Sequence, residues 1–310
     1  FGVQVSQQFT VDKPFTFIEF QNEYGSGGSQ RLTAGDSILR NGVRVRRLPL
    51  SRFSFGPRFD NSEVMLYDSS MGTYRAYPNN FVDFFETVAN SRTNIAVAGG
   101  GDYGSIRASY TNNNYKDVLP GFSQRSNTFS FNGNFKISPL ATIEFTSNIY
   151  DVKTVNRRPN IQQWVAAGLN RDYDYNWMKG FYRDAAGFRR DLEPYALNQN
   201  TPGIWPNAVS QLLWDQNDNR DEDKKFHVIS SLKATLQFTP SLSMTGQVAM
   251  DYTNTDLITQ DKVIRVVPAR VGGKYSWTKR NTLVMNYQAL LKFDKDLTDK
   301  INLFAYGGGS

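Results

Sequence analysis

Residues 125–149 read RSNTFSFNGNFKISPLATIEFTSNI, and the fold follows from the pattern in this stretch. Large apolar side chains alternate with polar ones before Pro139 and again after it. The apolar set comprises Phe129, Phe131, Phe135, Ile137, Ile143, Phe145 and Ile149. A period of two is typical of a β-strand with one apolar and one polar face. The stretch therefore predicts two antiparallel strands joined by a tight turn at Ser138–Ala141.

Three further segments, 228–238, 242–252 and 283–293, repeat this alternation. In the first of them Val228, Leu232 and Leu236 share one parity, while Val284 and Leu290 interrupt the pattern in the last. The chain is therefore predicted to be all-β. A soluble β-sandwich would show the same alternation, so the lengths of the connections have to separate the two architectures.

Short and long connections alternate along the chain. Tight turns are predicted at Gly99–Asp102, Ser138–Ala141, Thr239–Ser241 and Asp294–Lys300, and less clearly near Val11–Pro14. Long connections are predicted at Thr111–Gln124, Val152–Lys225 and Asn254–Lys279. Outer-membrane barrels have short periplasmic turns and longer extracellular loops. A soluble sandwich has no reason to gather its long loops at one end, so the asymmetry favours a transmembrane antiparallel β-barrel.

The composition agrees with a barrel in a bacterial outer membrane. Only 39% of the 310 residues are hydrophobic and the mean hydropathy is −0.51, which suits a wall that is apolar on its outer face alone. There is no cysteine, so disulfides and thiol chemistry are excluded. The net charge of +6 is scattered and without interleaved aromatics, which argues against nucleic-acid binding. The single histidine, His227, opens a predicted strand and is interpreted as a rim residue.

The connection 152–225 is the most informative stretch for function, because it holds four of the five tryptophans. Residues Ile161–Leu169 within it have a short helical pattern. Tryptophan and tyrosine combine a flat apolar face with a polar group, which suits sugar stacking or a protein interface. The alternative is that they pack the loop against itself and the barrel mouth. The candidates for contact with substrate or a covering protein are Trp164, Tyr173, Tyr175, Trp177, Trp205 and Trp214.

An acidic segment ends this connection and has oxygen-bearing side chains at alternate positions: Asp215, Asn217, Asn219 and Asp221. Such spacing resembles a calcium loop. Arg220 stands where such a loop needs glycine, however, and the bidentate glutamate at position twelve is absent, so a solvated extracellular loop is the alternative. No cofactor is otherwise expected. No facing carboxylate pair can be placed for acid–base catalysis, and the chain is not expected to be an enzyme.

Five stretches follow one another along the chain: Phe20–Gly27, Ser54–Asp60, Tyr77–Phe85, Val97–Tyr110 and Glu193–Asn198. In this order they resemble segments of the SusC/RagA-like TonB-dependent outer-membrane transporters of Bacteroidetes. The second resembles that family's S-[WF]-G-P-[KR]-x-D stretch and the third its P-x-N-x-x-D-F-F motif. The fifth is a weaker match, because Glu193 and Ala196 depart from the family's pattern.

The resemblance implies that residues 1–310 are the first part of the barrel, with about ten of roughly 22 strands. The plug domain and the closing C-terminal strands would lie outside them, and 152–225 would be a large extracellular loop. It also implies import of an oligosaccharide or oligopeptide with a SusD-like lipoprotein lid and the TonB–ExbB–ExbD complex, and a possible dimer of transporter–lid pairs.

Two other functions remain open at this point. A SusC-like barrel could act as an accessory or scaffold subunit of another outer-membrane assembly, such as a secretion translocon. A siderophore or vitamin receptor of the same broad barrel class is disfavoured, because the stretches at Gly56–Asp60 and Pro78–Phe85 resemble the SusC branch.

Overall fold

Nine strands form one antiparallel sheet in the order β1-β6-β7-β8-β9-β10-β11-β12-β13. The computed structural model describes residues 1–15, 19–28, 37–48, 53–66, 70–156, 170–190, 205–264 and 273–310, without the side chains of 38 and 205–209. From β6 onwards each strand pairs with the next one along the chain, as in an up-and-down barrel. The prediction of an antiparallel barrel-type sheet is confirmed, with nine strands in place of about ten.

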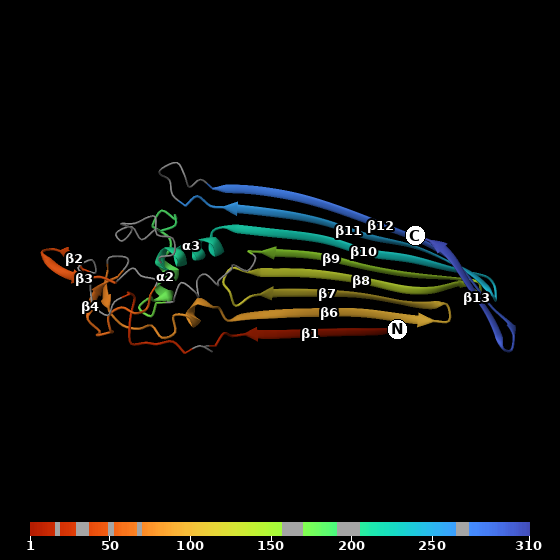
Figure 1. Cartoon of the computed structure of the whole chain (residues 1–310), viewed down its shortest axis with the longest axis horizontal. Coiled ribbons are helices and arrows are strands. Elements are labelled where there is room, and N and C mark those ends of the chain that lie inside the picture. Colours follow the sequence, from red (N-terminus) through yellow and green to blue (C-terminus); the bar gives the residue numbers. More distant parts are fainter. Residues whose placement is uncertain are drawn as a thin grey trace.

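The strands lie side by side and most are long enough to cross a membrane (Figure 1). They are β1 Gly2–Asp12, β6 Val88–Gly101, β7 Gly104–Lys116, β8 Ser123–Ser138, β9 Ala141–Val155, β10 Arg220–Thr239, β11 Leu242–Asp261, β12 Lys274–Thr298 and β13 Ile301–Gly309.

Small elements gather at one end of the sheet, on the left in Figure 1. They are the hairpin β2 Ser37–Arg40 with β3 Val43–Arg46, the pair β4 Glu63–Met65 and β5 Met71–Thr73, the 3₁₀ turn η2 Val82–Phe84, and the helices α2 Tyr175–Phe181 and α3 Trp205–Asn217. No helix within the described ranges is long and apolar enough to cross a membrane. The buried apolar cluster of the molecule also lies here, and not beneath the sheet.

Four of the predicted tight turns join β6 to β7, β8 to β9, β10 to β11 and β12 to β13, and all lie at the opposite end from the small elements. The prediction of a turn near Val11–Pro14 is wrong. Asp12 pairs with Val88, so β1 ends at the loop end and a long segment, 13–87, follows it. The connection predicted at Thr111–Gln124 is shorter than expected, because β7 runs to Lys116 and β8 begins at Ser123.

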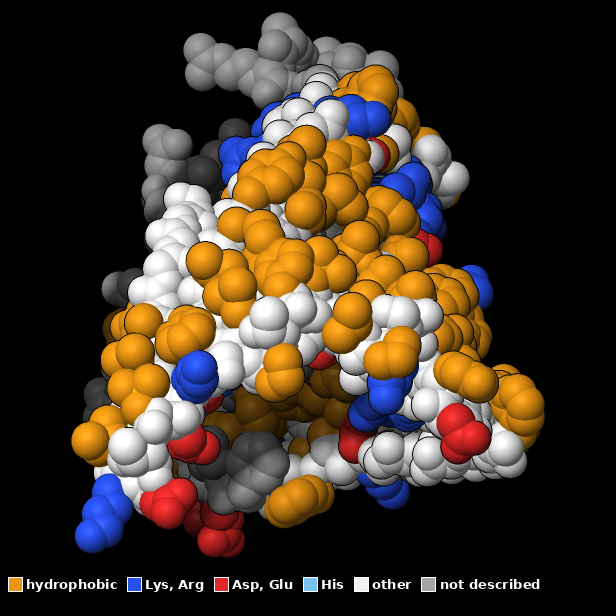
Figure 2. Space-filling model, turned by 90° about the vertical axis from the view of Figure 1, so that its right-hand side faces the viewer, with side chains coloured by type: hydrophobic (Ala, Val, Ile, Leu, Met, Phe, Trp, Pro, Cys, Tyr) orange, Lys and Arg blue, Asp and Glu red, His pale blue; other side chains and the backbone are white. Residues whose placement is uncertain are grey.

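The strand register aligns apolar side chains across eight of the nine strands, from β1 to β12. Eight directly paired residues on consecutive strands form what we call the apolar row: Val5, Ile95, Tyr110, Phe129, Ile149, Val228, Tyr252 and Leu283. Many apolar side chains of this face are unusually exposed, and Leu232, for example, is 53% exposed. Figure 2, which views the molecule from the tight-turn end, shows a broad patch of hydrophobic side chains on the surface. One face of the sheet is therefore suited to lipid.

The opposite face is polar. The pairing that follows the apolar row aligns Ser6, Asn94, Thr111, Thr128, Tyr150, His227, Thr253 and Thr282. His227 lies well inside β10, which begins earlier than the sequence suggested, and its Nε2 atom is 2.9 Å from Oδ1 of Asp251. Lys233 and Glu144 form an ion pair on the same face at 3.2 Å. Such a face suits the water-filled interior of a barrel.

The sheet is open. Within the described residues β1 pairs only with β6, and β13 pairs only with β12. A sheet of this kind leaves two rows of unpaired backbone groups, which hydrocarbon does not tolerate. The nine strands are thus an arc of a barrel.

Candidate functional site at the loop end of the sheet

Three residues of the 152–225 connection hold the N-terminal segments together at the loop end. Asn170 accepts a hydrogen bond at Oδ1 from Ser54 Oγ at 2.7 Å, and its carbonyl accepts one from Asn80 Nδ2 at 2.8 Å. The Arg171 guanidinium donates to Oδ1 of Asn80 at 2.5 Å, to Oδ1 of Asn22 at 3.0 Å and to the Pro78 carbonyl at 2.6 Å. We call Asn170–Asp172 the hub.

Asp172 completes the hub and is its most unusual member. It is 3% exposed, and it accepts hydrogen bonds from the Ser26 amide at 3.1 Å and the Ser26 hydroxyl at 2.6 Å. Burial raises the pKa of this carboxyl to about 6, although both hydrogen bonds from Ser26 act in the opposite direction. The loop end therefore contains a buried acid that titrates close to neutral pH.

Close backbone contacts explain the glycines in the first two family-like stretches. A Cβ atom on Gly56 would lie 1.9 Å from the Ser26 carbonyl oxygen, and Gly27 has a φ of +137°. The Tyr74 hydroxyl donates to the carbonyl of Pro57 at 2.8 Å beside them. These stretches, distant in sequence, thus meet around the hub, and their glycines are required because no side chain fits between the two backbones.

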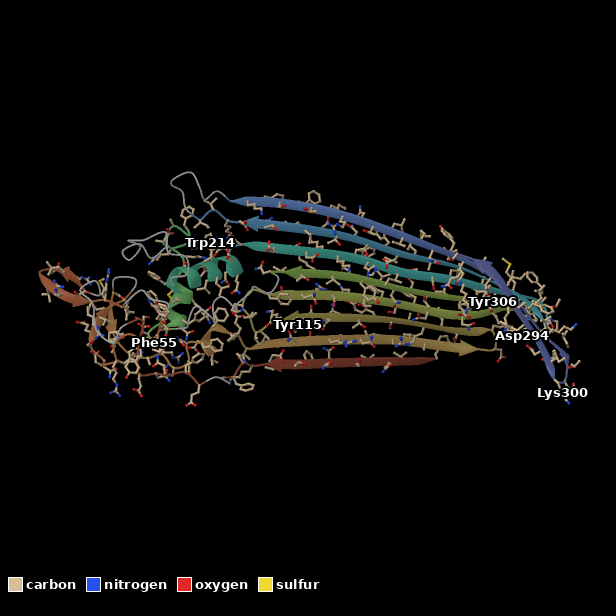
Figure 3. The ribbon with its side chains drawn as sticks, viewed as in Figure 1. Phe55, Tyr115, Trp214, Asp294, Lys300 and Tyr306 are labelled. Carbon is tan, nitrogen blue, oxygen red and sulfur yellow. The ribbon has the colours of Figure 1, made fainter. Side chains whose placement is uncertain are left out.

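Three of the predicted contact residues lie in the buried core of this end. Tyr173 is 1% exposed, Tyr175 0% and Trp214 1%, so none of them offers a surface to a ligand. The Tyr175 ring packs against Phe84 of η2 at a centroid distance of 5.1 Å. Figure 3 shows Trp214 with α3 at the loop end, far from Asp294 and Lys300 at the tight-turn end. For these three residues the structure matches the self-packing alternative.

Among the predicted contact residues whose side chains are described, Trp177 is the partly exposed one, and it packs against the edge of the buried core. Asp174 caps α2 by accepting a hydrogen bond from the Trp177 amide at 3.2 Å, which fixes where the helix begins. One turn later Phe181 stacks on Trp177 with ring centroids 4.3 Å apart and an interplanar angle of 21°. The Arg190 guanidinium lies 4.1 Å from the centre of the Phe181 ring. We call these three side chains the stacked cluster.

Two predicted contact residues and one predicted helix are not placed. Trp164 and Ile161–Leu169 lie outside the described residues. Trp205 begins α3, but its side chain is outside the described set. The weak family-like stretch Glu193–Asn198 is also outside it.

The calcium-like spacing does not form an extended loop. Asp215 and Asn217 lie in the last turn of α3, and Asp221 lies in β10. The Asp215 carboxylate accepts hydrogen bonds from Gln211 and Asn219 at 2.9 Å and 2.8 Å. Within the described part of the chain, no group of three acidic, histidine or cysteine side chains is arranged to hold a metal ion. The structure gives the weak calcium prediction no support.

Sequence reasoning missed the hub. Its residues are polar and precede the aromatic run, but their partners lie up to 149 positions away. The sequence offered one indication, namely that the family-like stretches contain Ser26, Ser54 and Asn80. The side chains of all three form hydrogen bonds with the hub.

No model of a known protein family and no curated protein matches the sequence. Solved structures with a similar fold do exist. The RagAB peptide transporter aligns with a TM-score of 0.57 and 13% identity over 74% of this chain and 25% of that chain. The RagAB peptide importer in its closed-closed state gives a TM-score of 0.57 and 13% identity over 75% of this chain and 26% of that one. Its open-open state gives a TM-score of 0.56 at 13% identity.

This similarity shows the fold, and the chain spans about a quarter of the length of the chains it matches. The two-faced sheet, its tight turns at one end and its RagAB-like course identify the architecture as an arc of an outer-membrane β-barrel. The chain has the fold of a partial SusC/RagA-like transporter barrel.

Proposed function

We propose that the chain forms part of a TonB-dependent importer in the outer membrane, which takes up an oligopeptide or oligosaccharide. A SusD-like surface lipoprotein would cover the loop end, the TonB–ExbB–ExbD complex would supply energy, and two transporter–lid pairs would associate as a dimer. The protein would not be an enzyme.

The observation that carries this proposal is the two-faced sheet combined with the close packing of the described loop-end segments around the hub. A polar inner face offers hydroxyl and amide groups such as Thr111, Asn94 and Thr128 to a hydrated solute. The RagAB structures are those of a peptide transporter, which makes an oligopeptide the first substrate to test.

The stacked cluster is the surface that we assign to lid or cargo. Its Trp177 and Phe181 rings stack face to face at the loop end, the Arg190 guanidinium lies over the Phe181 ring, and both rings are partly exposed. The exposed part of such a stack can contact a sugar ring, and it can also pack against an aromatic side chain of a protein.

The substrate class can be tested by growth. A strain that lacks the gene is expected to grow more slowly when oligopeptides are the only nitrogen source or oligosaccharides the only carbon source, and depletion of TonB should reproduce that defect. Co-purification from the wild type should recover a surface lipoprotein. A stable complex with no growth defect on any nutrient would instead favour the scaffold function.

Trp177→Ala tests the assigned surface. We expect it to reduce uptake or lipoprotein recovery about fivefold or more, because it removes one aromatic contact worth roughly 1 kcal/mol. Trp277→Ala is the matched control, since Trp277 is 61% exposed on the lipid-suited face of β12. If the two substitutions reduce uptake and lipoprotein recovery equally, the stacked cluster is not the contact surface. Import itself is tested separately by the growth experiment.

A further inference from the structure

Three cationic side chains face one another across neighbouring strands on the apolar face of the sheet. Arg125 of β8 pairs directly with Lys153 of β9, and Lys153 pairs directly with Lys224 of β10. Lys279 of β12 lies in the same row, beyond Asp256 of β11. Each has the same parity as the member of the apolar row on its own strand, and the register has no bulge between them. We call Arg125, Lys153, Lys224 and Lys279 the cationic row.

The cationic row lies on the loop-end side of the apolar row, four residues away on each strand. One such interval is Arg125 to Phe129, and another is Lys224 to Val228. Four residues cover about 13 Å along a strand, or about 10 Å along the membrane normal for a strand tilted by roughly 40°. The polar zone on each side of the hydrocarbon is about 5–8 Å deep, and lysine and arginine side chains reach several ångströms toward it. The cations are thus at headgroup level on the outer side.

The intervening position is polar on β7, β8, β9 and β11, where it holds Asn112, Asn127, Asp151 and Asn254. On β10 it holds Phe226, which pairs directly with Asp151 and with Asn254 and is 41% exposed. Tyr110 and Tyr252 of the apolar row lie at the adjacent edge of the apolar surface. Toward the loop end, successive rows of the sheet thus carry aromatic rings, then amides, then cations. This is also the order of polarity from hydrocarbon to headgroup.

The charges in and around the row are only partly compensated. The Glu222 carboxylate, whose side chain is 7% exposed, forms ion pairs with Lys153 at 3.1 Å, Lys224 at 2.8 Å and Arg220 at 2.5 Å. Asp151 and Asp256 lie on the same face, so five cations stand against three carboxylates. Arg125 is exposed and forms no ion pair with any described residue. Like charges placed directly opposite are unfavourable in a sheet, and an external anion would relieve them.

We propose that the cationic row binds the phosphate of an outer-leaflet glycolipid, the lipid A part of lipopolysaccharide. Arg125 and Lys153 hold the phosphate between β8 and β9, and Lys224 supports it from β10. The acyl chains of the same lipid lie along the apolar face below. A free phosphate ion would lack this second contact, so the site selects a lipid that has both parts.

Native mass spectrometry of the intact protein in mild detergent tests the proposal, with purified lipid A and chemically dephosphorylated lipid A as probes. The wild-type protein should bind the phosphorylated form at least fivefold more tightly. Arg125→Gln should weaken that binding about fivefold, which is the effect of one cation near an anionic surface. Inorganic phosphate at the same concentration should not compete.

Arg107→Gln is the matched control, because Arg107 is an exposed cation on the opposite, polar face of neighbouring β7. It should bind both lipids like the wild type, and the folded fraction of each variant is checked by its heat-dependent electrophoretic mobility. Equal affinity for the two lipids would overturn the proposal. So would equal losses in Arg125→Gln and Arg107→Gln, or displacement of lipid A by inorganic phosphate alone.

Discussion

Asp172 links the chemistry of one carboxyl group to the packing of the loop end. Its folded-state pKa of about 6 lies above the ordinary value of 3.8, so the folded protein holds the proton more tightly than the unfolded chain does. The stabilisation is fully present below pH 4 and is lost as the pH rises through 6. A shift of this size corresponds to about 2–3 kcal/mol.

We therefore expect the contact between Ser26 and Asp172 to open more readily at pH 7.5 than at pH 5. Hydrogen exchange of the segment around Ser26, corrected for the intrinsic pH dependence of exchange, measures this opening. Ser26 donates its two hydrogen bonds to different oxygens of Asp172. In Asp172→Asn the amide oxygen can accept from the Ser26 amide and the Nδ2 group can donate to the Ser26 hydroxyl, so the contact remains and its protection should not change with pH. Parallel pH profiles for the two proteins would contradict the assignment.

Gly56 gives a second test at the level of a single residue. Gly56→Ala places a methyl group 1.9 Å from the Ser26 carbonyl oxygen, and the two backbones must move apart. We expect a loss of about 2 kcal/mol or more in loop-end stability, seen as faster proteolysis of 13–87. Gly180→Ala in α2 is the control, since no atom lies within 4 Å of its Cβ position apart from its chain neighbours and the backbone of its own helix. It should be neutral or stabilising.

Sequence patterns predicted side chains in strands better than those in loops, and the reason is physical. The parity of Phe129 or Leu232 follows from a local period of two, so the facing direction can be read from neighbours alone. The burial of Trp214 and the partial exposure of Trp177 depend instead on packing between segments that are distant in sequence. Aromatic composition directed attention to the 152–225 connection, but it could not separate core residues from surface ones.

The strand pairing gives a test at the level of secondary structure. Leu232 and Ser231 are adjacent in β10 and point to opposite faces. Leu232→Arg puts a charge in the apolar belt and should cost about 2–4 kcal/mol of folding free energy in the membrane. Ser231→Arg faces the polar interior and should change it little. The folded fraction in lipid bilayers, measured by heat-dependent mobility, separates the two. A loss for Ser231→Arg that equals or exceeds the loss for Leu232→Arg would contradict this assignment of the two faces.

The predicted hairpins were correct where a turn signal stood between two alternating segments, as at Ser138–Ala141. The turn near Val11–Pro14 was wrong because Pro14 and the polar residues beside it mark only the end of a strand. The partner of β1 is β6, and nothing local to Asp12 indicates that its pairing residue is Val88. Long-range pairing is the part of sheet topology that local patterns do not specify.

The open edges give a prediction for the molecule as a whole. A polypeptide limited to residues 1–310 has unpaired edges at β1 and β13. We expect it to associate through these edges or to remain accessible to protease when refolded with liposomes. Sedimentation and protease protection measure both properties. A monomeric, protease-protected form with heat-dependent mobility would show that nine strands can close by themselves.

The strands also continue well past the membrane-facing surface. The member of the apolar row on β11 is Tyr252, yet the strand runs on to Asp261, about nine residues further. At a tilt of roughly 40° this part of the wall rises about 20 Å. This part of the arc therefore stands above the lipid headgroups. A molecule that approaches this side of the entrance from outside meets protein before it meets lipid.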